Sequence, residues 1–333
     1  VATLPAGDRE VMIERSVLER APEIRREFQN AQPFRHAAIE HFLDQDACEA
    51  LLRDFPAFDP KRAVNELGHV GRKAVVERVS GVSAFYRRFY DYINSPPFLK
   101  AMSELTGIPD LIADDTLFGG GTHENMAGQG LDVHVDFNID ERRMLHRRVN
   151  LLIYLNKEWQ EAWGGAIELH SNPRRPETDE VKSFLPLFNR ALVFETNEYS
   201  WHGFRRIVLP PDKANLSRKS FSIYLYTKDR PVEEVVAPHT TFYVPQPLPE
   251  HFRAGHTLDE RDAAALQALI ASRDGLLEMY QRLLIEKEQR FRDLLALDAG
   301  DRSRYHAVVS SRSWKLVMAL HQMRFHARRL FAR

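Results

Sequence analysis

The sequence has almost no cysteine and no long apolar run. Its single cysteine, Cys48, excludes a disulfide framework and a cysteine-rich metal site, and it is compatible with a reducing cytosol. No stretch approaches the roughly 20 apolar residues that span a bilayer. The N-terminal residues 1–26 carry charges throughout and lack the apolar core of a signal peptide. These absences predict a cytoplasmic protein.

An excess of one charge is also missing. The 46 basic and 47 acidic residues nearly cancel, so nothing in the overall charge predicts a nucleic acid as the partner. A chain of 333 residues, of which 44% are hydrophobic, is long enough to bury a substantial core. We therefore expect one large soluble domain or two modest ones.

Apolar and polar residues alternate without interruption through residues 131–139 (LDVHVDFNI). This period of two is typical of a strand with one apolar and one polar face, and it points His134 and Asp136 the same way. An imidazole and a carboxylate two residues apart on a strand can reach one metal ion. No other histidine of the fourteen is followed two residues later by an acid, but chance alone could supply one such pair.

Further short strands follow this one, with loops rather than convincing amphipathic helices between them. We predict strands at 148–155, 166–170, 191–195 and 218–226. Strands in succession favour an antiparallel sandwich or jelly roll over a parallel α/β sheet. Helices are expected in the N-terminal part of the chain, where they would cover the apolar side of a sheet. The glycine-rich stretch Gly119–Gly130 is expected to be a loop, either a pocket rim or an ordinary connection.

A third ligand candidate is His202, which follows the predicted strand 191–195. Two neutral imidazoles and one carboxylate on one face of a metal ion are the ligands of non-heme Fe(II) oxygenases, because they leave neighbouring positions open. The same three ligands and a water could also hold a catalytic zinc.

The segment 217–226 (SRKSFSIYLY) favours the iron alternative. Its alternation places Arg218, Ser220 and Ser222 on one face, and a buried arginine beside hydroxyls is a receptor for a carboxylate. Fe²⁺ with one aspartate leaves one positive charge, and the arginine adds a second. A dicarboxylate such as 2-oxoglutarate neutralises both, whereas unpaired buried charges would cost several kcal/mol each.

With these residues in place, the sequence resembles the Fe(II)- and 2-oxoglutarate-dependent oxygenases, in their prolyl-hydroxylase-like branch. The resemblance covers roughly residues 33–228. Five motifs carry it in order: His134-Val135-Asp136, RVNLLIYLN at 148–156, WGGAIEL at 163–169, Trp201-His202-Gly203 and Arg218-Lys219-Ser220. It extends to a family-like FL…FP pattern in residues 42–56.

The resemblance implies a mainly β fold with flanking helices, built on a double-stranded β-helix. Iron would be held by His134, Asp136 and His202. Arg218 would bind the distal carboxylate of 2-oxoglutarate, assisted by Ser220 and Tyr154. The implied reaction consumes O₂ and 2-oxoglutarate, yields succinate and CO₂, and hydroxylates an unactivated C–H bond, with ascorbate as reductant. Because Asp136 is present, no position is freed for a halide, which disfavours halogenation. The branch suggests a prolyl or amino-acid-type substrate.

The expected domain division is an N-terminal helical segment at 1–30, the oxygenase domain at 31–230, a Pro-rich linker at 231–256 and a helical tail at 257–333. In the tail, Ile270, Leu277, Leu284 and Phe291 recur every seven residues. This repeat is compatible with a short coiled coil, and hence a homo-oligomer, and equally with a helix packed on its own domain.

The end of the tail is basic. Residues 302–333 contain eight Lys or Arg and no acid, with apolar residues between them. Such a helix could lie on an anionic membrane surface or meet a partner, or it could dock on its own protein. The run SSRSWKLV at 310–317 resembles a segment attached to bacterial glycosyltransferases and polysaccharide-assembly proteins. That would imply a sugar or glycan precursor as substrate, at the inner face of the membrane.

Three simpler interpretations remain at this point. The chain could be a non-catalytic jelly-roll binding module with an oligomerising or membrane-docking tail, although the three ligands together with Arg218 argue against it. The competing histidines, His123, His146 and His170, are expected in loops or on the surface. The cationic run 142–148 is expected to be a solvated loop, with a pocket rim that prefers an anionic substrate as the alternative.

Overall fold

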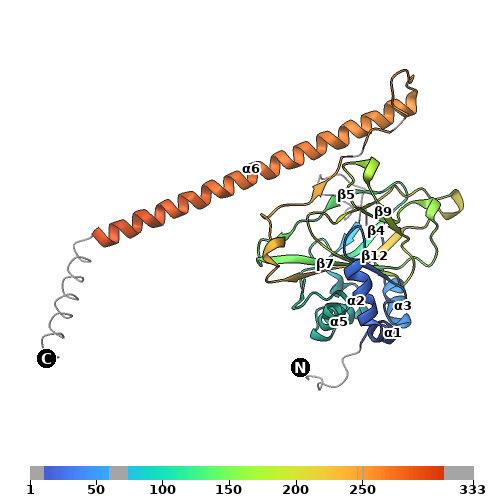
Figure 1. The fold of residues 1–333 in the computed structure, drawn as a ribbon, viewed down its shortest axis with the longest axis horizontal. Coiled ribbons are helices and arrows are strands. Elements are labelled where there is room, and N and C mark those ends of the chain that lie inside the picture. The colour runs from blue at the N-terminus through green and yellow to red at the C-terminus, as the bar shows by residue number, and fades with distance from the viewer. Residues whose placement is uncertain (1–10, 60–73, 246, 250, 311–333) are drawn as a thin grey trace. The chain divides into compact units, whose positions relative to one another are not determined.

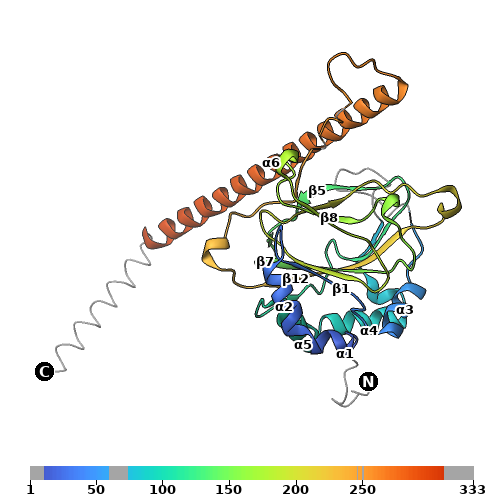
Figure 2. The same cartoon turned by 45° about the vertical axis from the view of Figure 1, so that its right-hand side comes forward.

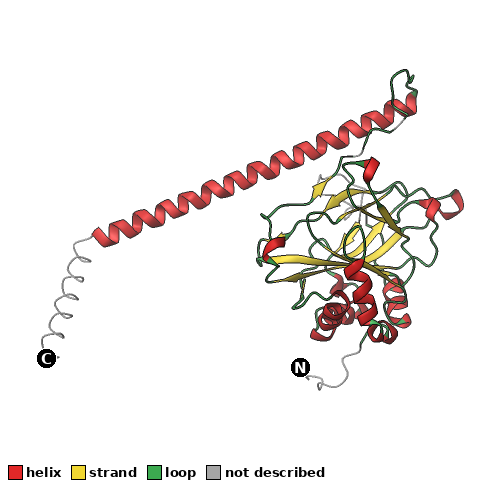
Figure 3. Cartoon of the chain, viewed as in Figure 1, coloured by secondary structure: helices red, strands yellow, loops and turns green. Residues whose placement is uncertain are grey.

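The computed structural model describes residues 11–59, 74–245, 247–249 and 251–310. The chain divides into two compact units, residues 1–269 and 270–333, and we describe each by itself. The first unit contains two β-sheets and a group of short helices, while the second is helical throughout its described part (Figure 1, Figure 3).

The larger sheet has eight strands. Its main path runs β1 (His36–Ile39), β10 (Ala191–Glu195), β7 (Leu145–Tyr154), β12 (Arg218–Thr227), β4 (Gly121–Asn125) and β2 (Ala74–Val76). Two short strands lie off this path: β3 (Ile112–Ala113) pairs with β12, and β6 (Ile139–Asp140) pairs with β7. Strands distant in sequence thus become neighbours at the centre, where β7 and β12 pair over almost their whole length.

The smaller sheet has five strands, in the order β13 (Phe242–Tyr243), β5 (Leu131–Val135), β11 (Trp201–Phe204), β8 (Ile167–His170) and β9 (Val181–Phe184). Each pairing between these strands is antiparallel. In Figure 2 the two sheets lie one above the other. This is the double-stranded β-helix that the resemblance implied, so that expectation is confirmed.

Five helices cover the outer face of the larger sheet, as Figure 2 shows. They are α1 (Arg15–Glu19), α2 (Ala21–Asn30), α3 (Gln45–Arg53), α4 (Ala84–Ile93) and α5 (Pro96–Thr106). The carboxylate of Asp44 caps α3 by accepting hydrogen bonds from the backbone N–H groups of residues 46 and 47. Helix α5 has prolines in its first turn and ends at Gly107, which has the left-handed φ of 76° that glycine adopts without strain.

The main core lies between these helices and the larger sheet. Strand β12 presents Phe221, Ile223 and Leu225 to it, and each of these side chains is buried. The alternate residues Ser220 and Ser222 face the smaller sheet, because successive strand side chains point to opposite faces. A second, smaller apolar cluster lies on that side and includes Leu152, Leu169, Leu192 and Phe194.

Some elements were not predicted from the sequence. Strand β4 (GTHEN) lies within the stretch expected to be a loop, so that expectation is wrong for residues 121–125. The strand has no apolar alternation, and pairing with β2 on one side and β12 on the other holds it in the sheet. Within residues 231–256, expected as a linker, β13 pairs with β5. Single-turn helices link several strands: η2 (Val79–Gly81), η3 (Glu161–Trp163), η4 (Pro176–Thr178), η5 (Pro211–Lys213) and η6 (Val232–Glu234).

The second unit consists of the greater part of α6 (Glu260–Ser310). The heptad residues Ile270, Leu277, Leu284 and Phe291 are all exposed. Of the basic end predicted at 302–333, the structure describes helical backbone as far as residue 310, and the remaining residues 311–333 lie outside the described part. None of the described helices has the length and apolar character needed to cross a membrane.

Candidate metal centre and anion pocket

The structure brings His134, Asp136 and His202 together. Strands β5 and β11 are neighbours, and His202 lies directly opposite His134. Nε2 of His134 is 3.8 Å from Oδ1 of Asp136, and Nε2 of His202 is 3.6 Å from Oδ2. One ligand atom from each of the three residues lies within 4.8 Å of the other two, and both histidines are buried. Residues 66 positions apart in the chain can therefore surround one ion, as the sequence predicted.

Both imidazoles are fixed by backbone carbonyls. Nδ1 of His134 lies 2.8 Å from the carbonyl oxygen of Asp132, and Nδ1 of His202 lies 2.8 Å from that of Ser200. A carbonyl oxygen can only accept, so in each neutral ring the proton sits on Nδ1. This tautomer leaves the lone pair on Nε2, the nitrogen that faces Asp136, which is the arrangement of metal-binding histidines.

Asp136 is held in its ionised form. Its Oδ2 accepts a hydrogen bond of 2.8 Å from Nδ2 of Asn150 and lies 3.1 Å from Nη2 of Arg147. Burial alone would raise the pKa of Asp136, but the charge of Arg147 and the Asn150 hydrogen bond hold that pKa below its ordinary value. The site therefore offers a negative oxygen and two neutral nitrogens, a set that suits Fe(II) or Zn(II).

Among the described residues, one other group of histidine and acidic side chains lies close enough together to hold a metal ion. His251, His256 and Asp262 stand where α6 begins, and Asp262 accepts hydrogen bonds from both imidazoles at 3.1 and 2.6 Å. Both histidines of this group are exposed, whereas those of the first group lie inside the β-sandwich. A metal-binding experiment on this protein must separate the two.

Arg218 is buried without a carboxylate partner among the described residues. Its side chain comes from β12, donates from Nε to the carbonyl oxygen of Gly165 at 2.7 Å and from Nη2 to the hydroxyl of Tyr154 at 3.3 Å. The guanidinium also lies over the ring of Phe204, 4.3 Å from its centroid. Burial lowers the pKa of Arg218, since no negative group nearby compensates it. A carboxylate ligand would supply the missing charge.

The other residues expected at this pocket also face the interior. Ser220 on β12 lies directly opposite Tyr154 on β7, and both are buried. Opposite Ser220 on its other side is His123, whose Nδ1 is 3.0 Å from Oγ of Ser222 and whose Nε2 is 3.0 Å from the carbonyl oxygen of Gly119. The expectation that His123 lies in a loop or on the surface is wrong, because β4 is a buried strand without a sequence signal.

The other two histidines that were expected in loops or on the surface, His170 and His146, differ in burial. His170 is buried on β8, not on the surface, and its Nδ1 lies 2.6 Å from Asp179. It pairs with Trp201 and therefore lies on the face of the smaller sheet away from His202. His146 is partly exposed, near the beginning of β7.

The cationic run 142–148 is not a solvated loop. Strand β7 begins within it, and Arg147 and Arg148 are 2% and 5% exposed. Arg147 contacts Asp136, whereas Arg148 forms a 3.0 Å ion pair with Glu195. Sequence reasoning missed both, because a buried strand end and an exposed loop with several arginines look alike in a single sequence.

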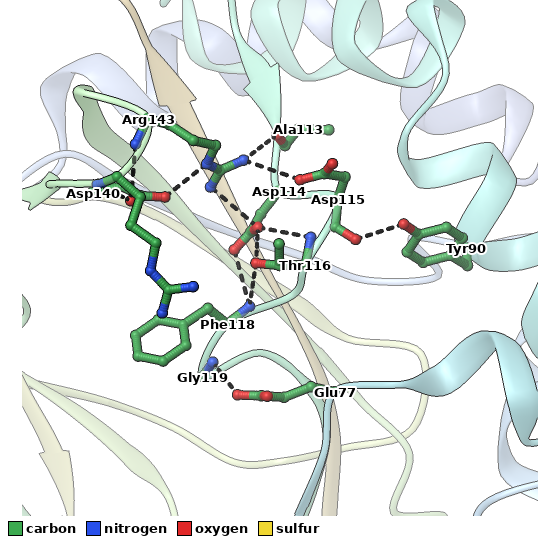
Figure 4. Close-up of polar contacts among 11 residues, drawn as sticks. Glu77, Tyr90, Ala113, Asp114, Asp115, Thr116, Phe118, Gly119, Asp140 and Arg143 are labelled. Atoms are coloured by element: carbon green, nitrogen blue, oxygen red, sulfur yellow. Dashed lines mark hydrogen bonds and ion pairs between the residues drawn. The ribbon is translucent and has the colours of Figure 1, made fainter.

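Arg143, four residues earlier, ties together two segments near the site (Figure 4). It pairs with Asp140 at 2.7 Å and with Asp114 at 3.1 Å. Asp114 in turn accepts from the backbone N–H of Phe118, and the carbonyl oxygen of Gly119 accepts from the hydroxyl of Tyr224 at 2.9 Å. The network fixes the segment 113–119 beside β12, and none of these contacts involves His134, Asp136 or His202.

Strand β13 also contributes to the site. Tyr243 lies opposite His134, and the two rings are 5.2 Å apart. Asn138, just after the metal motif, holds the chain before β13: its Oδ1 accepts from the backbone N–H of His239, and its Nδ2 donates to the carbonyl oxygen of Ala237. The sequence did not predict this contribution, since the proline-rich composition concealed it.

The comparison with protein families finds a match in the central part of the chain. Residues 121–226 match the family described as the 2OG-Fe(II) oxygenase superfamily. This match supports the assignment of residues 121–226 to that superfamily. The matched range contains each of the six predicted site residues, from His134 to Ser220. The oxygenase class and the cofactors of the superfamily, Fe(II) and 2-oxoglutarate, agree with the expectation from the sequence.

Several solved structures are similar in fold at low identity. A prolyl hydroxylase from Trichoplax adhaerens, in complex with a hypoxia-inducible-factor peptide fragment, is 15% identical with a TM-score of 0.43, covering 65% of this chain and 94% of that one. A Pseudomonas putida prolyl-4-hydroxylase is 17% identical, with a TM-score of 0.38 and coverages of 62% and 100%. HygX from Streptomyces hygroscopicus, with nickel and 2-oxoglutarate bound, is 13% identical, with a TM-score of 0.38 and coverages of 58% and 82%. No curated protein sequence matches the chain.

Proposed function

We propose that this chain is a hydroxylase in which His134, Asp136 and His202 hold Fe(II), and Arg218 binds the distal carboxylate of 2-oxoglutarate with help from Tyr154 and Ser220. One observation carries the proposal. A buried set of two imidazoles and one carboxylate shares the interior of the sandwich with a buried guanidinium that pairs with no carboxylate of the described residues. The two halves fit opposite ends of an iron-chelating dicarboxylate.

Iron and 2-oxoglutarate, when bound, would supply the oxidising chemistry: the substrate C–H, O₂ and 2-oxoglutarate give the C–OH product, succinate and CO₂. The chain itself orients the three ligands, and Arg218 would fix the far end of the co-substrate. Apolar side chains of the inner cluster, among them Leu169 and Phe194, surround this space. The Phe194 ring lies 4.7 Å from the His202 ring, so it would help to exclude water from the reacting groups.

The substrate of this proposed reaction belongs to one of two classes. A prolyl or amino-acid-type group follows from the prolyl-hydroxylase-like motifs, and a sugar or glycan precursor follows from the SSRSWKLV run in the tail. Both present unactivated C–H bonds. The helical tail, as an oligomerising or membrane-docking element, remains part of the proposal.

The test is turnover by the purified full-length chain with Fe(II), ascorbate and 2-oxoglutarate. We expect succinate to form, slowly without substrate and faster with the right one. A screen of proline-containing peptides and nucleotide sugars, read by mass spectrometry for the gain of one oxygen atom, separates the two substrate classes. Asp136→Ala should abolish succinate formation. Equal succinate formation by the wild type and Asp136→Ala would refute the proposed site.

A further inference from the structure

The two oxygens of Asp136 are not equivalent. Oδ2 receives the amide of Asn150 and the guanidinium of Arg147, at 2.8 and 3.1 Å. Oδ2 thus carries both a hydrogen bond and an ion pair, which makes it the more engaged of the two oxygens. The histidine distances do not separate the two oxygens, since Oδ1 lies 3.8 Å from Nε2 of His134 and Oδ2 lies 3.6 Å from Nε2 of His202. Because Asn150 and Arg147 contact only Oδ2, Oδ1 is the oxygen that remains for a metal ion.

Arg147 also fixes the amide that holds Asp136. Its Nε and Nη2 lie 3.1 and 2.9 Å from Oδ1 of Asn150, and only the oxygen of that amide can accept from a guanidinium. The amide nitrogen must therefore turn the other way, toward Asp136. A flipped amide would present an oxygen to the carboxylate and break both contacts.

The residues around Arg147 restrict its side chain to a single conformation. The side chain is 2% exposed, and its guanidinium carbon lies 3.7 Å from the ring centroid of Tyr224 and 4.7 Å from that of Phe137. The register of β7 and β12 shifts between Leu225 and Tyr226. In a regular strand, residues 148 and 150 would lie on the same face, and residue 147 would lie on the opposite face. The irregularity places Arg147 on the same face as Asn150, so that the two side chains make contact.

We propose that Arg147, acting through Asn150 and directly, is a positioning residue of the iron site that holds Asp136 as a one-oxygen ligand. This inference rests on the proposed function. Its consequence is geometric: Asp136 occupies a single coordination position, so the positions needed by the co-substrate and O₂ stay open.

A purely electrostatic role for Arg147 predicts the opposite result. A cation about 3 Å from a ligand repels the incoming metal, so removing the charge should tighten metal binding. If Arg147 positions the ligand, its removal should weaken metal binding by roughly 10- to 100-fold, as for other groups that orient metal ligands. Arg147→Lys separates the two, because it keeps the charge and loses the forked hydrogen bonds.

The experiment is a calorimetric titration of the metal-free, full-length chain with Co(II), which accepts nitrogen and oxygen ligands and absorbs visible light. All variants carry His256→Ala, so that the exposed group at the start of α6 does not take up the metal. We expect Arg147→Met, Arg147→Lys and Asn150→Ala to bind Co(II) roughly 10- to 100-fold more weakly. The visible spectrum should change as well, because the coordination geometry of Asp136 is released.

Arg143→Met is the matched control. Arg143 also pairs with aspartates, as Figure 4 shows, but these are Asp114 and Asp140 and not a residue of the metal centre. Its Co(II) affinity should be unchanged. Unaltered or tighter binding by both Arg147→Met and Arg147→Lys, with an unaltered spectrum, would overturn the inference. If Arg147→Met does not fold, as judged by circular dichroism, Arg147→Lys and Asn150→Ala decide the question by the same criterion.

Asp136→Ala distinguishes this inference from the proposed function. If Asp136→Ala binds Co(II) as well as its parent does, the metal centre itself is wrong. If Asp136→Ala loses the metal while the Arg147 and Asn150 variants keep parental affinity and spectrum, the proposed function stands and only the positioning role fails.

Discussion

Two arginines are buried on neighbouring central strands, and their surroundings differ. Arg147, 2% exposed, has the carboxylate of Asp136 3.1 Å away. Arg218, 4% exposed, contacts a carbonyl oxygen, a hydroxyl and aromatic rings. Burial would lower the pKa of both; the charge of Asp136 reverses this for Arg147, whereas the pKa of Arg218 stays lowered. In our proposals the paired arginine holds a ligand of the metal centre in place, and the uncompensated arginine receives the carboxylate of the co-substrate.

The largest expected effect is on the stability of the metal-free protein. Arg147→Met leaves the buried carboxylate of Asp136 without its partner, which should cost about 3–5 kcal/mol of unfolding free energy. Arg218→Met should cost clearly less, because it removes an uncompensated charge and breaks no ion pair. Urea unfolding of the two variants in the presence of a chelator measures both. Equal losses would contradict the distinction between the two arginines.

For binding of the co-substrate, Arg218→Met should have a larger effect than Arg147→Met, the reverse of their order in stability. Arg218→Met removes a charge-assisted contact to 2-oxoglutarate and should weaken its binding to the metal-loaded protein by about 2–4 kcal/mol, or roughly 30- to 1,000-fold. Arg143→Met, in which an equally charged residue outside the pocket is removed, is the control and should bind normally. Competition between 2-oxoglutarate and its analogue N-oxalylglycine, followed by calorimetry, gives the affinities. Undiminished binding by Arg218→Met would remove the arginine from the pocket.

The same comparison can be made by changing pH. The pKa of Asp136 in the folded protein lies below its ordinary value of about 3.9. A group with a depressed folded pKa contributes stability that is present above the unfolded pKa and is lost as pH falls through the folded one. Metal-free wild type should therefore lose stability below about pH 4, and Arg218→Met should lose it in parallel. Arg147→Met should show a smaller acid dependence, and denaturant curves at pH 7 and pH 3 test this. A parallel decline in all three would contradict the prediction.

The smallest effect concerns the neutral partner of Arg218. Tyr154→Phe removes the hydroxyl that lies 3.3 Å from Nη2 and should weaken 2-oxoglutarate binding by about 0.5–1.5 kcal/mol. The ring stays, so stability should change little. The buried hydroxyl of Tyr86, which donates to the carbonyl oxygen of Leu51 in the helical core, offers a matched control, since Tyr86→Phe should leave the affinity alone. A loss in Tyr154→Phe as large as in Arg218→Met would show that the arginine is not the main anion receptor.

The elements that could be predicted from the sequence are those with a local sequence signal. Regular alternation predicted β5 and β12, and short segments separated by loops predicted β7, β8 and β10. Strand β4 has no such signal, because it lies between two other strands and takes its conformation from their hydrogen bonds. Strand β13 was hidden by prolines, and His123 and Tyr243 were missed with these two strands.

The sequence by itself indicated the oxygenase superfamily and the six residues expected at the site, because short motifs on single strands carry both the metal-ligand spacing and the resemblance to the family. Only the tertiary structure decided what surrounds them: that Arg147 and not Arg148 meets Asp136, and that Arg218 is left without a carboxylate among the described residues. The physical reason is that a buried charge is stabilised by groups that are close in space, and a strand irregularity or a pairing between distant strands chooses those groups without leaving a pattern in the sequence.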